Sequence, residues 1–350
     1  MSDLRINNIT NGNGDAGPTI AGVSTVATSA FMVMPISDTE IRGAGSGRGV
    51  IFVNNQPSTK TLNKIEIATT GNADDFGDSM VSKNFSSYFA SSTRGIFAGG
   101  QPSVSPYYIS DIEYVIISSS GGGIDFGDLS KGSSTLIADR GSAAGSNDST
   151  RGLIAGGRTP SDGGGRKDID FVTMASTGDS VDFGELVQAR SEFQGGMANG
   201  TRAVFAGGYT TTDFFSIIDT VNVQSKGEAT KFGELSALKA RLTNTSNSTR
   251  GLTMGGKSPS PGNPTNIIEF ITMSTEGNAQ DFGDLTNTVM SMSACSSRTR
   301  SVQCGGITPS NTNTLQFVTI STTGDATDFG DMTAAFRGNA AVSDVNGGLG

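Results

Sequence analysis

The sequence contains no histidine and no tryptophan, and only two of its 350 residues are cysteines. Without histidine, the chain lacks the commonest general base, the Ser-His-Asp triad and most zinc and copper sites. Two cysteines cannot supply a framework of disulfides. These absences argue against most hydrolytic and metal-dependent enzymes, and we expect a non-enzymatic protein with no cofactor and no metal site.

Charge and long apolar runs are also scarce. Charged residues make up 16% of the chain, the net charge is −9, and the lysines and arginines form no basic run. Nucleic-acid binding through phosphate contacts is therefore not expected. No apolar run is long enough for a membrane-spanning helix, and residues 1–14 are too polar for a signal peptide, so neither membrane insertion nor Sec-dependent export is expected.

The sequence is rich in repetition, with a period of about fifty residues. Asp-Phe-Gly-Asp or a close variant occurs at residues 75–78, 125–128, 182–185, 231–234, 281–284 and 328–331. A second phrase begins with arginine and ends in a glycine pair, at residues 94–100, 151–157, 202–208, 250–256 and 300–306, after a degenerate copy at 48–53. Such a period indicates a repeat architecture, in which recurring residues hold the fold and function lies in what differs.

One repeat, residues 190–236, predicts four short antiparallel strands. Asn199-Gly200 is a strong hairpin turn, an apolar strand follows at 202–206, and a glycine pair ends it. A polar loop at 209–215 leads to an alternating strand at 217–223 and a last strand near 231–235. A four-stranded sheet of this size cannot bury both faces alone, and radial stacking of six such sheets produces a β-propeller.

The repeated residues and the ends of the period have predicted places in this propeller. Glycine pairs suit inner strands that approach closely or need positive φ. The first repeat lacks its own first strand, whereas residues after 336 supply an extra one, so the C-terminal strand is expected to close the ring. The aromatic side chains expected between adjacent blades are Phe76, Phe126, Phe183, Phe232, Phe282 and Phe329.

The pattern resembles the kelch repeat, in which an arginine precedes the first strand and a Gly-Gly pair closes the second. The glycine pairs end at Gly100, Gly157, Gly208, Gly256 and Gly306, and the arginines are Arg140, Arg190, Arg241 and Arg337. Phenylalanine replaces the usual tryptophan, and Asn54-Asn55 replace the first glycine pair. The resemblance covers residues 48–350 and implies an all-β, six-bladed kelch-like propeller, which we assign to residues 46–350.

Residues 1–45 fall outside the period and are interpreted as a β-rich or extended N-terminal arm. The arm resembles leader segments of structural proteins of tailed bacteriophages, particularly marine ones. The repeats, with the sequence Asp-Phe-Gly-Asp-Leu after a Thr-Gly-Asn-Ala turn, resemble kelch-like proteins of the same phages. This resemblance implies a virion protein, such as a tail fibre, tail-associated adhesin or head decoration, that is assembled in the host cytoplasm and is able to form homo-oligomers. Its arm would bind other virion proteins; the alternative is a flexible terminus without a role. The candidate anchor residues are Ile6, Ile9, Ile20, Val23, Phe31 and Met34.

The loops after the glycine pairs vary between repeats and are expected to share one face with the connections between blades. Aromatic and basic side chains on variable loops above a rigid scaffold suit binding of a host-surface protein or glycan, although they could instead cover the rim. The candidate binding residues are Tyr107, Tyr108, Arg158, Arg166, Lys167, Tyr209, Phe214 and Phe215.

Other functions stay open. A free kelch-type protein-interaction module is the main alternative, and a glycan-active enzyme built on the propeller is the third. Asp-Phe-Gly also occurs in kinases, but a repeat at this period without the other kinase motifs argues against one. Cys295 and Cys304 are expected on neighbouring strands, either as two buried thiols or as a cross-strand disulfide.

Overall fold

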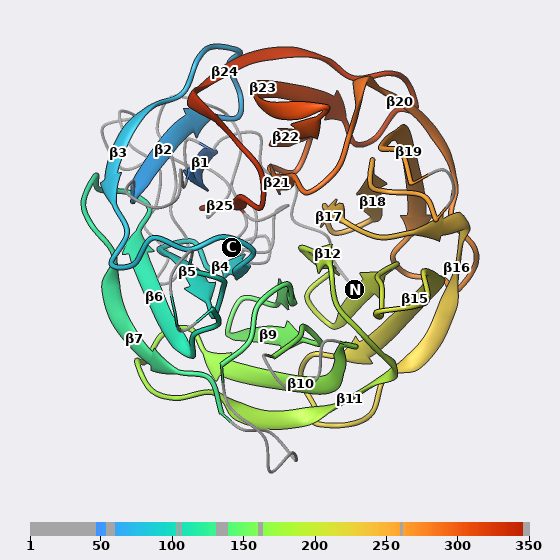
Figure 1. Cartoon of the computed structure of the whole chain (residues 1–350), viewed down its shortest axis with the longest axis horizontal. Helices are drawn as coiled ribbons and strands as arrows, with labels where there is room; N and C mark the ends of the chain where they lie inside the picture. Colours follow the sequence, from blue (N-terminus) through green and yellow to red (C-terminus); the bar gives the residue numbers. More distant parts are fainter. Residues whose placement is uncertain are drawn as a thin grey trace, which may run out of the picture.

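The computed structural model describes residues 47–53, 60–102, 105, 107–130, 139–159, 164–259 and 262–345. Their strands form six sheets arranged radially around one axis (Figure 1). This confirms the all-β, six-bladed propeller. The part of the chain that the structure describes contains no helix, and thus none long and apolar enough to cross a membrane. The predicted arm, with its six anchor residues, lies outside the described residues.

Each blade contains four strands, counted outward from the axis. The innermost strands are β25 (Ala340–Ser343), β4 (Ser87–Ala90), β8 (Ala144–Asn147), β13 (Met197–Ala198), β17 (Leu242–Ser246) and β21 (Ser293–Ser296). The second strands are β1 (Arg48–Phe52), β5 (Arg94–Ala98), β9 (Arg151–Ala155), β14 (Arg202–Ala206), β18 (Arg250–Met254) and β22 (Arg300–Thr308). In this order they define the first to the sixth blade.

The outer half of each blade is longer in blades three to six. The third strands are β2 (Thr61–Glu66), β6 (Asp111–Ile116), β10 (Arg166–Thr173), β15 (Phe215–Asn222), β19 (Thr265–Thr272) and β23 (Ser310–Thr319). The outermost strands are β3 (Asp74–Asp78), β7 (Ile124–Asp128), β11 (Val181–Arg190), β16 (Thr230–Lys239), β20 (Gln280–Val289) and β24 (Thr327–Phe336). Arg166, Lys167 and Phe215 therefore belong to strands, although the sequence placed them in loops.

The C-terminal strand closes the ring, as the sequence predicted. β25 pairs antiparallel with β1, from Gly49 opposite Ser343 to Phe52 opposite Ala340. The first blade is thus built from both ends of the propeller sequence, and β1 is not left with an open inner edge.

The fourth blade departs from the predicted pattern at its inner strand. A left-handed Gly195, at φ 64°, interrupts the stretch before β13. A short strand, β12 (Phe193–Gln194), pairs in parallel with β17 of the fifth blade instead. A Cβ atom on Gly195 would lie 2.3 Å from the carbonyl oxygen of Asn244, so this crossing between blades depends on glycine.

The Asp-Phe-Gly-Asp phrase joins each blade to the next through its backbone. The phenylalanine carbonyl accepts a hydrogen bond of 2.7–3.1 Å from a turn glycine of the following blade, at all six junctions. The phenylalanine side chains are buried at 2–3% exposure and pack between blades, as predicted; Phe76, for example, packs in one cluster with Val115 and Ile117 of the second blade.

The arginine that begins each second strand forms another inter-blade contact. Its Nη1 donates to the carbonyl of the residue after the third strand in the next blade, over 2.9–3.4 Å at all six junctions. In four blades the guanidinium also lies over the aromatic ring of its own third strand. Recurrence of this arginine therefore reflects assembly of the propeller.

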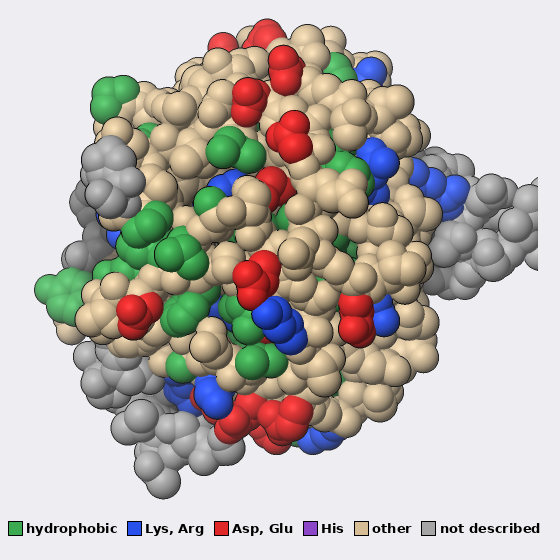
Figure 2. All heavy atoms as spheres, turned by 90° about the vertical axis from the view of Figure 1, so that its right-hand side faces the viewer, with side chains coloured by type: hydrophobic (Ala, Val, Ile, Leu, Met, Phe, Trp, Pro, Cys, Tyr) green, Lys and Arg blue, Asp and Glu red, His purple; other side chains and the backbone are tan. Residues whose placement is uncertain are grey.

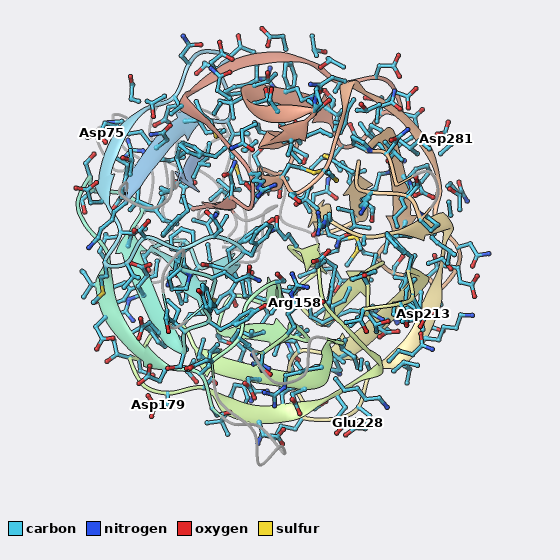
Figure 3. The ribbon with its side chains drawn as sticks, viewed as in Figure 1. Asp75, Arg158, Asp179, Asp213, Glu228 and Asp281 are labelled. Carbon is cyan, nitrogen blue, oxygen red and sulfur yellow. The ribbon has the colours of Figure 1, made fainter. Side chains whose placement is uncertain are left out.

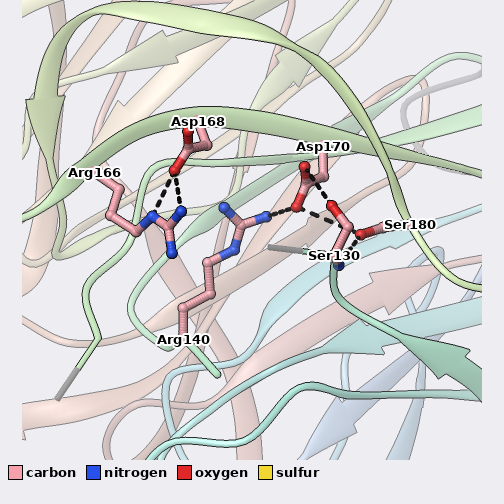
Figure 4. Close-up of polar contacts among 6 residues, drawn as sticks. All are labelled: Ser130, Arg140, Arg166, Asp168, Asp170 and Ser180. Carbon is pink, nitrogen blue, oxygen red and sulfur yellow. Dashed lines mark hydrogen bonds and ion pairs between the residues drawn. The ribbon is translucent and has the colours of Figure 1, made fainter. Parts of the chain in front are cut away.

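Buried ion pairs tie the third strand of a blade to the segment that leads into that blade. The base of the pair lies in the inter-blade connection, as Lys83 and Arg140 do, or ends the outermost strand of the preceding blade, as Arg190 and Lys239 do. In the third blade, Arg140 pairs with Asp170, which also accepts a hydrogen bond from Ser130 of the same connection (Figure 4). The equivalent pairs are Lys83–Glu113 at 3.1 Å, Arg190–Asp219 at 2.9 Å and Lys239–Glu269 at 2.5 Å. In the sixth and first blades an amide replaces the acid, as Gln316 and Asn63, and an apolar residue replaces the base, as Val289 and Phe336.

The four arginines that suggested the kelch repeat do not occupy equivalent positions. Arg140 and Arg190 form the buried ion pairs, whereas Arg241 and Arg337 lie one or two positions further along their own connections. The glycine pairs, by contrast, are equivalent in five blades and left-handed in each.

Candidate binding face

The two faces of the propeller carry different parts of the repeat. Successive strands in a blade run antiparallel, so the loops after the glycine pairs share a face with the connections between blades. We call this the loop face, as the sequence predicted it. The turns that join the first to the second strand and the third to the fourth lie on the opposite side, which we call the turn face.

A closed ring of backbone hydrogen bonds surrounds the axis on the loop face. One residue from each inter-blade connection donates its N–H to the carbonyl of its counterpart in the preceding connection, over 2.5–3.0 Å. The ring residues are Phe85, Ser142, Glu192, Arg241, Ser291 and Gly338, and all six have a left-handed φ of 55–67°. The ring fixes the backbone, and its side chains are free to differ between blades.

Behind this ring, a single tyrosine fills the axial channel. The hydroxyl of Tyr88, in β4, lies 3.0 Å from Thr243 Oγ1 in β17 of the opposite blade. Burial raises the pKa of Tyr88 well above its ordinary value. The inner strands leave about 30 Å³ for the centres of water molecules, room for roughly two waters. The channel is therefore a packed axis with little space for a ligand.

The residues that follow the glycine pairs form a second circle outside the ring. Each lies in an isolated antiparallel bridge with the connection of its own blade. These residues are Gln101, Arg158, Tyr209, Lys257 and Ile307. Arg158 lies near the axis, whereas Asp75, Asp179, Glu228 and Asp281 lie around the rim (Figure 3). The loop-face centre therefore has side chains that the repeat does not dictate.

The structure separates the predicted binding residues by accessibility. Tyr107 is 65% exposed, Tyr108 is half-buried and Lys167 is exposed. Arg166 is 5% exposed and forms an ion pair with Asp168, which holds it inside the third blade (Figure 4). Of the two basic residues in β10, only Lys167 is thus accessible to a partner.

The predicted aromatic residues of the fourth blade come together. Tyr209 and Phe214 pack edge to face with ring centroids 4.9 Å apart, at the two ends of one short turn. Phe215 follows at the start of β15, opposite Lys239, and all three aromatic side chains are half-buried. Hydrophobic side chains also gather toward one side of the molecule in the space-filling view (Figure 2).

Two residues that were not among the predicted binding residues join Arg158 at the ring. The carboxylate of Glu192 accepts from Arg158 Nη2 at 2.8 Å and from Arg241 Nε at 2.7 Å. Glu192 is 7% exposed, beneath two partly exposed guanidiniums. The sequence contained a signal for these two residues, because Glu192 and Arg241 are the only charged residues at the six ring positions.

The ends of the described propeller meet on the turn face. Gly47, before β1, accepts a hydrogen bond from Ile67 at the end of the third strand, and Asp344, after β25, donates to Arg48. Burial raises the pKa of Asp344 to about 6. The point where the described chain enters and leaves the propeller therefore lies on the face opposite the variable loops.

The two cysteines are free and buried. Cys295 opposes Val302 and Cys304 opposes Ser293, so the thiols are diagonal neighbours in the β21–β22 pair instead of direct partners. Burial raises the pKa of Cys304, which keeps its thiol protonated. In the described ranges, no three histidine, cysteine, aspartate or glutamate side chains come together in a way that could hold a metal ion.

No protein family model matches the chain, and a comparison with curated proteins finds no significant match.

Proposed function

We propose that this chain is a non-enzymatic structural protein of a bacteriophage particle, as a tail fibre, tail-associated adhesin or head decoration. Residues 1–45 attach it to other virion proteins, and the propeller presents its loop face to a host-surface molecule. The resemblance of the repeats to kelch-like phage proteins supports this assignment. Affinity then comes from several modest contacts multiplied by the copies on one particle.

One observation carries the proposal. The described chain enters and leaves the propeller on the turn face, while the non-repeated side chains are on the loop face. An arm that leads away from the turn face can hold the particle without covering the loop face. The inter-blade hydrogen bonds make the propeller a rigid spacer between these two functions, which suits a presented binding surface.

The test is to purify the particles produced from the genome that encodes this chain and to identify their proteins by mass spectrometry. Immunogold labelling with antibodies against the propeller then locates it. The proposal expects the chain in stoichiometric amounts on intact particles. A chain that is abundant in infected cells but absent from washed particles would refute the virion assignment and favour the free kelch-type interaction module.

A further inference from the structure

One half of the loop-face centre differs in chemistry from the other. Blades three to five and their connections carry Arg158, Glu192, Tyr209, Phe214, Arg241 and Lys257, which we call the mouth sector. The remaining described positions of the two circles are Phe85, Gln101, Ser142, Ser291, Ile307 and Gly338, none of them charged.

The mouth sector is one continuous surface. Glu192 contacts both arginines, and the preceding residue, Ser191, exchanges two backbone hydrogen bonds of 2.9 Å with Tyr209. On the other side of the fourth blade, Ala240 exchanges backbone hydrogen bonds with Lys257. Because backbone pairs fix these positions, the points from which the side chains project are set before any partner binds.

The sector carries more positive than negative charge, although the chain as a whole carries −9. Two guanidiniums contact the buried carboxylate of Glu192, and Lys257 adds a third cation. With the exposed Asp213 of the neighbouring turn counted, three cations stand against two carboxylates. Glu192 occupies three of the ten N–H donors of these guanidiniums, in hydrogen bonds or ion pairs of 2.7–3.4 Å. Side-chain exposures of 25% for Arg158 and 34% for Arg241 leave both groups accessible to an incoming anion.

A rigid turn with two aromatic residues, Tyr209 and Phe214, lies beside these cations. Thr210 donates to the Asp213 carbonyl at 2.8 Å, and the Tyr209 hydroxyl donates to Thr211 at 2.7 Å, which fixes the ring against Phe214. Asp213 is exposed at the tip of this turn and offers carboxylate oxygens as acceptors. Aromatic faces receive the apolar face of a sugar ring, and a nearby carboxylate accepts from its hydroxyl groups.

We propose that the mouth sector binds an acidic saccharide. Arg158 and Arg241 receive its carboxylate, Tyr209 and Phe214 receive the face of a sugar ring, and Asp213 accepts from hydroxyl groups. Guanidinium and carboxylate match in geometry as well as charge, which favours a carboxylated sugar over a neutral one. The inference deepens the proposed function, since it names the class of host-surface molecule that the loop face recognises.

The test uses the isolated full chain and saturation-transfer NMR, followed by titration. The probes are 3′-sialyllactose, a hyaluronan tetrasaccharide and, as the uncharged reference, lactose. We expect saturable binding of at least one acidic probe and at least about tenfold weaker binding of lactose. Arg241→Gln and Phe214→Ala should each weaken binding of the acidic probe by about tenfold, whereas Gln101→Ala, on the uncharged half, should leave it unchanged.

Circular dichroism confirms that each variant is folded. Absence of binding by both acidic probes, equal binding of lactose, or binding that survives both substitutions would overturn the inference. The result is independent of the virion assignment. A chain that binds acidic saccharides but is absent from particles would refute only the proposed function, and a virion protein that binds neither acidic probe would refute only this inference.

Discussion

Glycine at the third position of the Asp-Phe-Gly-Asp phrase permits the outer strand to touch the next blade. A Cβ atom on Gly233 would lie 2.0 Å from the carbonyl oxygen of Gly277. The sequence predicted close backbone approach for the glycine pairs, and the same explanation applies to this glycine. Its partner could not be predicted, because it lies 44 residues further along the chain, in the next blade.

Gly233→Ala should therefore lower the free energy of unfolding by about 2–3 kcal/mol, because backbone has to move to admit the methyl group. Gly277→Ala is the matched control, since its Cβ would meet no atom within 4 Å. That substitution should change stability by less than about 0.5 kcal/mol, or raise it slightly. Chemical denaturation of both variants measures the difference, and equal stabilities would contradict the close-contact explanation.

Tyr88 is a residue that periodicity could not reveal. The equivalent positions of the other blades hold Gly145, Gly196, Asn244, Ala294 and Ala341, and these smaller residues leave room for one tyrosine across the axis. Because Tyr88 occurs in only one repeat, comparison of the repeats alone gives no reason to assign it a role. Its importance emerges only once the six inner strands are placed around one channel.

The raised pKa of Tyr88 predicts a specific pH dependence of stability. The unfolded chain loses the tyrosine proton near pH 10, while the folded protein retains it, so stability is complete below pH 10 and declines above it. Between pH 9 and pH 11 the wild type should lose about 1.4 kcal/mol more than Tyr88→Phe. Urea unfolding of both proteins at the two pH values measures this, and parallel losses would exclude ionisation of Tyr88 as the cause.

At the scale of elements, the blades use one of two residue pairs at the buried site between the third strand and the segment that leads into the blade. Four blades pair an acid on the third strand with a base on the segment that leads into the blade, and two blades have an amide and an apolar residue at these positions. In both pairs a side-chain oxygen accepts a hydrogen bond from the preceding blade, as Glu269 does from Ser236 N–H and Gln316 from Thr286 N–H, each at 2.7 Å. The cation is present only where the acceptor is charged.

Lys239→Val should lower the free energy of unfolding by about 3–5 kcal/mol, because it leaves Glu269 buried and unpaired. The double variant Lys239→Val with Glu269→Gln copies Val289 and Gln316 of the sixth blade. Its loss should shrink to about 1 kcal/mol, since the glutamine still accepts from Ser236. Thermal and chemical unfolding compare the two variants; a double variant no more stable than the single one would refute the equivalence of the two residue pairs.

The sequence contains a positional signal for these buried ion pairs. Lys83, Arg190 and Lys239 each lie seven residues after a repeated phenylalanine, whereas an insertion in the second blade displaces Arg140 to fourteen. The strands were easier to predict than these ion pairs, because strand alternation and turn residues act locally along the chain. The strand extensions that contain Arg166 and Phe215 were not predicted, because pairing across the blade overrides the polar, loop-like sequence there.

At the scale of the whole molecule, the number of blades and their closure by the C-terminal strand followed from counting repeats and from the unmatched ends. The loop face followed from strand alternation alone. The mouth sector could not be predicted, because Arg158, Glu192 and Arg241 belong to different repeats and meet only around the axis. We therefore propose a division of the molecule into repeated residues that build a rigid ring, a turn face that serves for attachment, and a loop face that serves for binding.

Electron cryomicroscopy of the particle that carries this chain tests that division most directly. The map should show the six-bladed ring with its turn face toward the particle, residues 1–45 running into neighbouring virion proteins, and the loop face with the mouth sector open to solvent. A ring whose loop face is packed against the capsid or tail, with the turn face outward, would contradict the account.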